Sequence, residues 1–388
     1  MDKTTAQPNP TSIDELVTPC LLLDRNRMRR NIRRMSARIG GLGGVLRPHV
    51  KTGKSIDVLQ EIVAAGNTAG ITVSTLREAD YFLRHGIADI TYAVGIAPNK
   101  FGAAAELVAR GADLKIILDS VEMAGQLADY AARERVAYKV LVELDTDDHR
   151  SGADPYGDDL LDVGRCLHES PYVDFTGVLT HAGASYSCRT PDALLAMARQ
   201  ERDRAVAAAG RLRAAGIPCP VVSIGSTPTA LTVDDLAGVT EVRPGVYVFL
   251  DLVMAGLGVC SVDDIAVSVL ASVTGFQERK NWAITDAGWM ALSRDRGTAD
   301  QDVDYGYGIV ADRSGNAVAD LIVSDANQEH GIVASRQAER APQTAFELGD
   351  LVRILPNHAC ATAAQFDAYF VLDEQGLVCD RWERTGGW

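Results

Sequence analysis

The stretch KIILDSVEMAGQLADYAARERVAYKVLVELD, residues 115–145, decides the fold class of this chain. It begins with a β-rich run at 115–120 and ends in a second one at 138–145. The segment between them is rich in alanine, leucine and arginine, with apolar residues at helical spacing. A strand–helix–strand unit of this kind predicts two parallel strands joined by a helix.

The same alternation continues on both sides of this unit. Further β-rich runs lie at 20–24, 45–52, 70–75, 90–95, 175–183 and 221–226, with helical segments such as FGAAAELVARGA between them. Eight strands that are each followed by a helix or a long loop predict an α/β fold, a TIM-like (β/α)8 barrel. We expect this barrel to span residues 20–265.

The pattern changes after about residue 265. Short runs such as VSVLASVTGF, NWAITDA, HGIVAS and AYFVLD are separated by glycine, aspartate and asparagine turns, and no long helix interrupts them. This pattern predicts a second, all-β domain over residues 266–388, with residues 1–19 packed against it.

Composition excludes several classes of protein. The net charge of −14 over 388 residues and the absence of a basic stripe argue against a nucleic-acid partner. The N-terminal sequence is polar and contains no apolar segment, so we expect neither a signal peptide nor a membrane span. Seven scattered cysteines without a CxxC pair suit a reducing cytoplasm.

The end of the predicted second strand carries Lys51, within RPHVKTGKS. Active-site residues of such barrels come from the C-terminal ends of the strands. A lysine in an apolar site is an amine nucleophile that can form a Schiff base. The alternative is a solvent-facing lysine just past a strand, which is how we interpret Lys54.

Two glycine-containing turns late in the barrel could bind a phosphate group through backbone N–H donors. One is Gly225-Ser226-Thr227, and the other, 243–247, contains Gly245 and Tyr247. Plain turns between a strand and a helix would need the same glycines. Tyr186, in HAGASY, is a further candidate to contact the phosphate or a cofactor ring.

A possible metal site is the pair His358 and Cys360 in PNHACATAAQF. In extended chain, residues two apart point to the same face, so the pair could clamp an ion. Imidazole and thiolate together favour zinc, although manganese or another divalent ion is open. His181, at the end of the predicted seventh strand, is a candidate general base, or else a hydrogen-bonded barrel histidine.

These motifs together resemble one enzyme family. The segments TPCLLLDRNRMRRNI, RPHVKTGKS, THAGASY, SIGSTPT, EVRPGVYVFLD, DAGWMALSRD and PNHACATAAQFDAY look like the D-threonine aldolase/D-serine dehydratase family, which consists of alanine-racemase-like, fold type III enzymes that use pyridoxal 5'-phosphate (PLP). The resemblance runs from about residue 18 to Trp388. It implies that Lys51 carries PLP and that the β domain closes the site in a homodimer.

The resemblance also implies individual roles. Arg150 would reach the phenolic oxygen of PLP, although Thr146-Asp147-Asp148 departs from the family pattern, and pairing with one of these aspartates is the alternative. His358 and Cys360 would bind a divalent metal (Mn²⁺, Zn²⁺ or Mg²⁺) close to PLP. His181 would face this metal and act as base toward the substrate's β-hydroxyl.

The implied substrates are β-hydroxy D-amino acids, and the resemblance favours retro-aldol cleavage of D-threonine to glycine and acetaldehyde. A D-serine/D-threonine dehydratase and an aldolase or dehydratase acting on 3-hydroxy-D-aspartate are the alternatives within the class. A non-catalytic PLP-binding protein is the alternative from another class. Such a protein stops after the barrel, whereas this chain adds a β domain with the His358/Cys360 pair.

The assignment of Lys51 predicts a covalent link to the cofactor. Purified protein should absorb visible light after PLP addition, and borohydride should fix the cofactor to Lys51, as peptide mass analysis can show. A Lys51→Ala variant should take up no label, while Lys54→Arg should be labelled like the wild type. A label on Lys54, or no chromophore at all, would contradict the assignment.

Overall fold

The computed structural model describes residues 11–338 and 340–388, which form two compact units. One comprises Ile32–Tyr247 with Gly387–Trp388, and the other comprises 11–31 with Val248–Gly386. The boundary near the N-terminus falls inside helix α1 (Arg25–Gly41). None of the helices in the described part of the chain combines the length and apolar character that a bilayer crossing needs.

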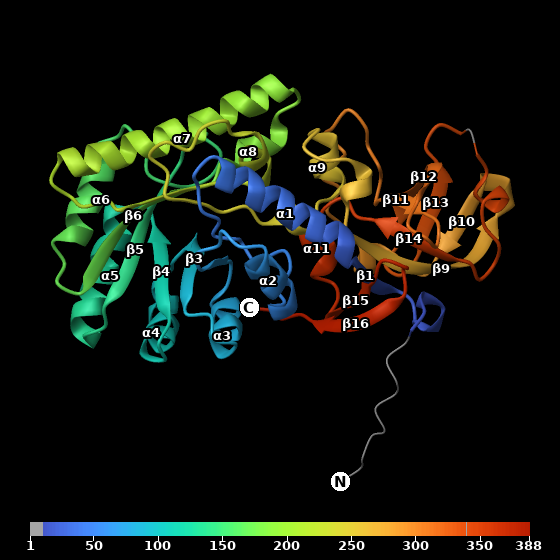
Figure 1. Ribbon diagram of the computed structural model, residues 1–388, viewed down its shortest axis with the longest axis horizontal. Coiled ribbons are helices and arrows are strands. Elements are labelled where there is room, and N and C mark those ends of the chain that lie inside the picture. Colours follow the sequence, from blue (N-terminus) through green and yellow to red (C-terminus); the bar gives the residue numbers. More distant parts are fainter. Residues whose placement is uncertain (1–10, 339) are drawn as a thin grey trace, which may run out of the picture. The chain divides into compact units, whose positions relative to one another are not determined.

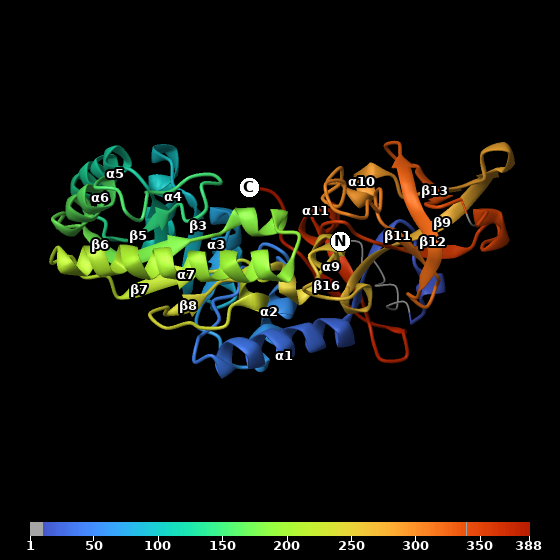
Figure 2. The same ribbon diagram turned by 90° about the horizontal axis from the view of Figure 1, so that it is seen from above.

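The first unit contains seven parallel strands that neighbour one another in chain order. They are β2 (Ile71–Val73), β3 (Asp89–Gly95), β4 (Asp113–Leu118), β5 (Tyr138–Leu144), β6 (Val173–Thr180), β7 (Val221–Ile224) and β8 (Glu241–Val242). The helices of this unit besides α1 are α2 (Ile56–Ala64), α3 (Leu76–Arg84), α4 (Phe101–Ala109), α5 (Val121–Glu134), α6 (Asp159–His168), α7 (Pro191–Ala214) and α8 (Thr227–Thr232). Figures 1 and 2 show α7 alongside β6 and β7, which it contacts. The alternating pattern is therefore confirmed for this unit.

A segment around Leu46 closes the ring of strands. Leu46 forms parallel bridges to both Thr68, before β2, and Val242 in β8, and His49 forms a bridge to Thr72. The segment makes only isolated bridges, because Pro48 has no N–H to donate to a ladder. It is nevertheless the first of eight barrel positions, and Lys51 follows it.

The structure corrects the predicted first barrel strand. Residues 20–24 form β1 (Cys20–Asp24), which pairs antiparallel with β9 (Val267–Gln277) and parallel with β15 (Ala368–Leu372) in the other sheet. The eighth barrel strand is β8, whose two residues precede Pro244 and are too short to give a sequence pattern. The division into units accordingly differs from the predicted boundaries of 20–265 and 266–388.

The second unit is a mostly antiparallel nine-stranded sheet. Its order is β10-β13-β12-β11-β14-β9-β1-β15-β16, and a further β9–β10 pairing curls it into a barrel. The remaining strands are β10 (Trp282–Thr285), β11 (Ile309–Ala311), β12 (Ala317–Ala326), β13 (Gly331–Ser335), β14 (Leu351–Leu355) and β16 (Val378–Glu383), and the short α-helices are α9 (Leu252–Gly256), α10 (Trp289–Leu292) and α11 (Ala359–Ala363). The expected all-β domain is thus confirmed, with β16 added at one edge.

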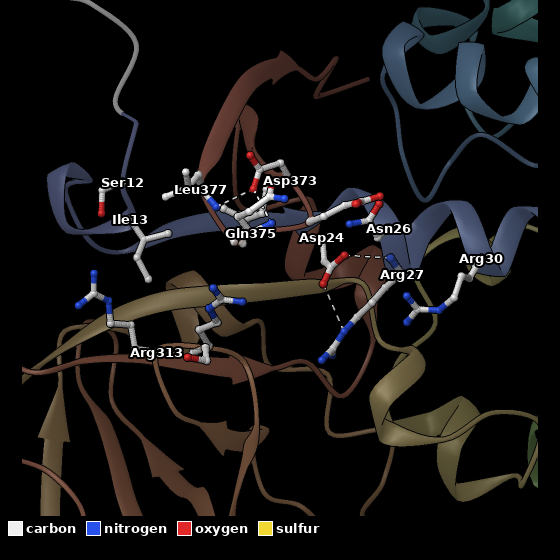
Figure 3. Close-up of a pocket in the computed structure, with 15 residues that line it drawn as sticks. Ser12, Ile13, Asp24, Asn26, Arg27, Arg30, Arg313, Asp373, Gln375 and Leu377 are labelled. Carbon is white, nitrogen blue, oxygen red and sulfur yellow. Dashed lines mark hydrogen bonds and ion pairs between the residues drawn. The ribbon is translucent and has the colours of Figure 1, made fainter.

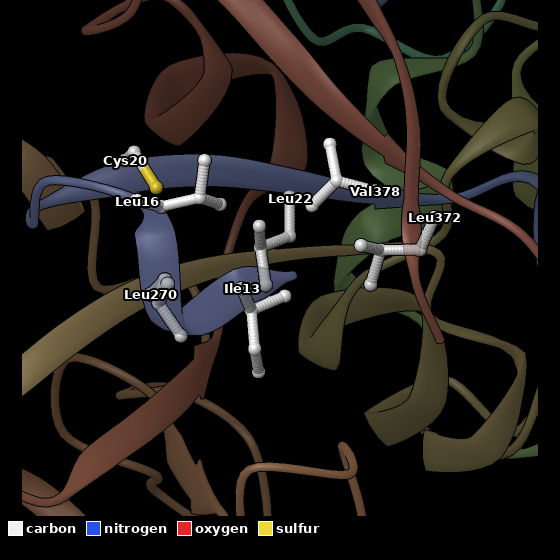
Figure 4. Packing of buried hydrophobic residues seen from close by; sticks show 7 residues of the cluster. All are labelled: Ile13, Leu16, Cys20, Leu22, Leu270, Leu372 and Val378. Atoms are coloured by element: carbon white, nitrogen blue, oxygen red, sulfur yellow. The ribbon is translucent and has the colours of Figure 1, made fainter. Parts of the chain in front are cut away.

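The N-terminal segment contributes to the core of this second unit. Figure 4 shows the buried cluster, which consists of Ile13, Leu16, Cys20, Leu22, Leu270, Leu372 and Val378. Ile13 and Leu16, from the segment expected to pack against the β domain, thus lie in its core. The prediction for residues 1–10 lies outside the described residues.

The cluster makes a stability prediction. Leu270 on β9 is fully buried in it, so Leu270→Ala should lower the free energy of unfolding by about 2–5 kcal/mol through lost burial and a residual cavity. Leu348, which is 70% exposed, provides the control: Leu348→Ala should change the free energy by less than about 0.5 kcal/mol. Thermal or urea unfolding measures both, and equal losses would refute this account of the core.

Candidate active site

Lys51 directly follows the segment that closes the barrel. Burial and then the nearby charge of Lys51 lower the pKa of both His49 and His181, so these three side chains share one environment. Among the described residues no carboxylate forms an ion pair with Lys51, whereas Lys54 pairs with the buried Glu78 at 3.1 Å. This distinguishes the two lysines: the charge of Lys54 is paired with Glu78, whereas Lys51 forms no ion pair among the described residues.

His181 follows β6, which is the sixth barrel strand and not the seventh as predicted. Its Nδ1 lies 3.1 Å from the carbonyl oxygen of Gly225. A carbonyl only accepts, so Nδ1 carries the proton and Nε2 keeps its lone pair. Burial and the charge of Lys51 lower the pKa of His181 to about 3, which leaves the imidazole neutral at neutral pH. The Tyr186 ring lies 6.2 Å from that of His181, centroid to centroid.

The first predicted phosphate turn follows β7 and begins α8. Gly225 has a φ of +125°, and a Cβ there would lie 2.9 Å from the backbone nitrogen of Arg243, so only glycine fits. Ser226 is the N-cap of α8, and its hydroxyl lies 3.1 Å from that of Ser185. The turn is thus packed tightly against the one that follows β8.

The second predicted turn follows β8 and meets the first. The backbone N–H of Tyr247 donates to Oγ1 of Thr227 at 3.2 Å. A Cβ on Gly245 would lie 3.0 Å from the carbonyl oxygen of His49, which brings this turn against the segment before Lys51. The second turn therefore lies close to His49 and Thr52, on either side of Lys51 in the chain, and the two turns follow barrel strands seven and eight as expected.

The residues of these turns fit the phosphate of PLP. The hydroxyl of Tyr247 is buried and has no hydrogen-bond partner among the described residues. A buried hydroxyl without a partner is costly, and an oxygen-rich group would satisfy it. Gly225 and Gly245 permit the close backbone approach that phosphate binding uses.

Arg150 lies at the same end of the barrel. Its guanidinium is 3.4 Å from a carboxylate oxygen of Glu143, at the end of β5, and its charge helps to lower the pKa of His181. Its pairing partner is therefore Glu143, and the suggested pairing with a loop aspartate is not seen. With 58% of its side chain exposed, Arg150 can turn toward a bound group.

Sequence reasoning missed two buried charged residues beneath the site. Arg243 donates to the Ser223 hydroxyl at 2.6 Å and to the Thr180 carbonyl at 2.5 Å, and burial lowers its pKa to about 10. Glu201, on α7, accepts from the backbone N–H groups of Ala182 and Gly225 at 2.9 and 3.1 Å with a single oxygen. Glu201 thereby fixes both peptides that hold His181.

The burial of Glu201 had a signal in the sequence. It belongs to one helical stripe, Leu194, Ala198, Glu201, Ala205 and Ala208, that is buried throughout. Its other carboxyl oxygen has no hydrogen-bond partner among the described residues. Burial raises the pKa of Glu201, and its hydrogen bonds lower the pKa by less. The net rise shifts the equilibrium toward the neutral carboxylic acid.

The predicted metal pair, His358 and Cys360, lies in the second unit, the all-β unit (β unit), and the backbone geometry of the pair differs from the prediction. His358 is the N-cap of α11 and Cys360 lies in its first turn, so the two do not stand in extended chain. The alanines of ACATA favour a helical turn over a strand. His358 Nδ1 lies 2.6 Å from Asp295, and the buried Asp251 accepts from the backbone N–H of Ala359 at 3.0 Å.

This donor set fits a divalent metal. A carboxylate behind one ring nitrogen of a histidine orients the other nitrogen toward an ion, as metal sites commonly show. Burial lowers the pKa of His358, but Cys360 and Asp295 outweigh it and raise the pKa to about 11 in the metal-free protein. No cluster of three or more possible ligands occurs among the described residues, so His358 and Cys360 would leave positions open for water or substrate.

Comparison with known proteins finds matches over nearly the whole chain. Residues 23–252 match the family model of the alanine racemase N-terminal domain, and residues 266–372 match that of a serine dehydratase domain. D-threo-3-hydroxyaspartate dehydratase of Delftia sp. is 54% identical, over 96% of this chain and 98% of the relative. D-serine dehydratase of Dictyostelium discoideum is 32% identical, over 98% of this chain and 99% of the relative. D-threonine aldolase of Arthrobacter sp. is 28% identical, over 94% of this chain and 91% of the relative.

Solved structures agree with these matches. A D-threo-3-hydroxyaspartate dehydratase in which a cysteine is replaced by alanine, described as metal-free, is 53% identical with a TM-score of 0.94 and covers 96% of this chain and 99% of its own. Another structure of this enzyme has a histidine two positions earlier replaced by alanine. D-threonine aldolase of Filomicrobium marinum (24% identical, 98% of each chain, TM-score 0.84) shares the fold.

The protonation state of Glu201 is testable. Glu201→Gln keeps an oxygen that accepts from Ala182 and Gly225, so its melting temperature and PLP affinity should stay close to the wild type. Glu201→Ala leaves both N–H groups unsatisfied and should cost about 2–4 kcal/mol of stability. Thermal unfolding and PLP titration measure these effects, and a Gln variant as damaged as the Ala variant would show that the ionised carboxylate is required.

Proposed function

Because the chain belongs to the family of alanine-racemase-like PLP lyases that includes the D-serine dehydratases, we propose that it eliminates water from β-hydroxy D-amino acids, with D-threo-3-hydroxyaspartate as its first substrate. Loss of water would leave an enamine, and its hydrolysis, which takes up one water, would give a keto acid and ammonia. The observation that carries this proposal is the 54% identity, over 96% of the chain, to a D-threo-3-hydroxyaspartate dehydratase. Retro-aldol cleavage of D-threonine, which the sequence motifs favoured, is the second candidate, supported by 28% identity to a D-threonine aldolase.

The residues of the barrel unit would hold the cofactor and move protons. When bound, PLP withdraws electrons from the substrate's Cα and so makes bonds at that carbon easier to break. We assign Lys51 to hold the cofactor and, in dehydration, to remove the proton from Cα. Tyr247 and the turns at Gly225 and Gly245 would hold the phosphate, and Arg150 the phenolic oxygen.

Which bond of the substrate breaks depends on which proton is removed first. Removal of the Cα proton by Lys51 leads to loss of the β-hydroxyl, whereas removal of the hydroxyl proton breaks the Cα–Cβ bond. The His181 lone pair at Nε2 is the available base for the second route. Burial and the charge of Lys51 lower the pKa of His181 to about 3, so its imidazole is neutral and keeps the Nε2 lone pair that the cleavage route would need.

We assign the β unit's pair, His358 and Cys360, to a divalent metal. The matching spacing of the histidine and cysteine replaced in the relative, and the metal-free state of its cysteine variant, support this assignment. A bound metal would supply Lewis-acid chemistry toward the β-hydroxyl. Asp295 would orient His358 for that role. Mn²⁺, Zn²⁺ and Mg²⁺ remain the candidate ions, and a homodimer in the cytoplasm remains a prediction.

Product analysis tests the proposal. The holoenzyme, with and without added Mn²⁺, Zn²⁺ or Mg²⁺, is supplied with D-threo-3-hydroxyaspartate, D-threonine and D-serine. We expect keto acid and ammonia as products, formed fastest from D-threo-3-hydroxyaspartate. The L-isomers should react far more slowly. Glycine with an aldehyde as the main products would instead establish the aldolase.

Metal removal and matched variants test whether His358 and Cys360 bind a metal that the reaction needs. His358→Ala and Cys360→Ala should keep the visible chromophore and lose turnover by several orders of magnitude, since loss of a Lewis acid costs several kcal/mol and each 1.4 kcal/mol is about tenfold. Chelation of the wild type should have the same effect and added metal should reverse it. Full activity in verified metal-free protein would overturn the metal assignment.

A further inference from the structure

The β unit contains a cavity of about 430 Å³ that the proposed reaction does not use. The start of α1, the β11–β12 turn and the β15–β16 turn surround it, and Figure 3 shows side chains from these elements around one space. Four arginines are among its lining residues: Arg27, Arg30, Arg313 and Arg353. A volume of this size suits a small organic molecule.

The central observation is a buried arginine that has no carboxylate at ion-pair distance, although Asp24 and Asp312 act on it from farther away. Arg353, on β14, is 7% exposed, and its Nε has no hydrogen-bond partner among the described residues. No carboxylate of the described residues forms an ion pair with it. A Cβ on Gly315 would lie 2.8 Å from its Nη1, so glycine in the β11–β12 turn leaves room for the guanidinium. A buried, unpaired cation is costly unless an anion accompanies it.

A second arginine of the cavity is also unpaired. Arg30, exposed on α1, forms no ion pair with any described residue. The two other arginines are satisfied within the protein: Arg27 pairs with Asp24 at 3.3 Å, and Arg313 pairs with Asp14. The cavity therefore presents two guanidinium groups that form no ion pair with any of the described residues.

The carboxylates of the cavity do not pair with these two guanidinium groups. Asp24 also caps α1, accepting from the backbone N–H of Arg27 at 2.9 Å. Asp373 accepts from the backbone N–H groups of Gln375 and Leu377, both at 2.9 Å, and so is occupied in its own turn. Glu374 is exposed at the tip of that turn. The carboxylates thus have partners or face solvent, whereas Arg353 is enclosed.

We propose that this cavity binds a small dianionic oxyanion, a phosphate or a dicarboxylate, through Arg353 at its base and Arg30 at its rim. Guanidinium groups match both anions with paired N–H donors. Two unpaired arginines call for two negative charges. The side-chain amide of Asn26 and the hydroxyl of Ser314, which also line the cavity, supply neutral donors.

Ligand-induced stabilisation of the holoenzyme tests the proposal. Melting temperatures are measured against concentration of inorganic phosphate, succinate and the monoanion acetate, with chloride holding ionic strength constant. Phosphate or succinate should raise the melting temperature in a saturable way, and acetate should not. The stronger of the two dianions identifies the preferred geometry, one tetrahedral centre or two separated carboxylates.

Matched variants locate the site. Arg353→Met and Arg30→Gln should each weaken dianion binding about tenfold or more, the usual effect of losing a charge-assisted hydrogen bond. Arg279→Gln, at an exposed position in the 3-10 helix Glu278–Lys280, should bind as the wild type. Arg30 is exposed, so its variant serves even where Arg353→Met fails to fold. Equal stabilisation by acetate, or undiminished dianion binding in Arg30→Gln, would overturn the proposal.

Discussion

The closure of the barrel by residues 46–50 is the constraint on which the candidate site depends. The backbone N–H of Arg47 donates to the carbonyl of Val242 at 2.9 Å, and that of Thr72 donates to the carbonyl of Pro48 at 2.9 Å. This short segment, the first barrel position, thus joins β2, the second, to β8, the last. It places Lys51 immediately beyond the last hydrogen bond, and it brings the turn at Gly245 against His49. A register shift here would move the lysine away from the phosphate turns.

Beneath this end of the barrel lies a network of buried charge. Arg47 pairs with Glu241 at 2.6 Å, Glu241 accepts from Ser223 at 2.5 Å, and Arg243 donates to that same serine. Burial, and after it nearby charges that include Lys51 and Arg243, lower the pKa of His49 and His181 and leave both imidazoles neutral. The positive charges of Lys51 and Arg243 suit a cofactor and substrates that carry phosphate and carboxylate groups.

The β unit uses its acidic residues to position other groups. Asp251 accepts from the N–H groups of Met254 and Ala359 and so connects α9 with α11. Asp295 holds His358 by one ring nitrogen. Both carboxylates therefore contact the segment that contains His358 and Cys360, the pair proposed to bind a metal. The arginine cavity shows the opposite arrangement, in which a buried cation has no carboxylate of the described residues at ion-pair distance.

The sequence by itself determined the alternation of strands and helices and the change to an all-β pattern, and it predicted Lys51, His181, Gly225 and Gly245 as site residues. These are local signals, because periodicity, glycine turns and motif order are read along the chain. Only the tertiary structure decided that β1 joins the β sheet, since an apolar strand does not specify its partners. Likewise it alone revealed the helical turn at Cys360, the carboxylate behind His358 and the pairing of Arg150 with Glu143. Hydrogen bonds between residues distant in sequence, such as Glu201 to Ala182 and Gly225, exist only once the barrel has closed.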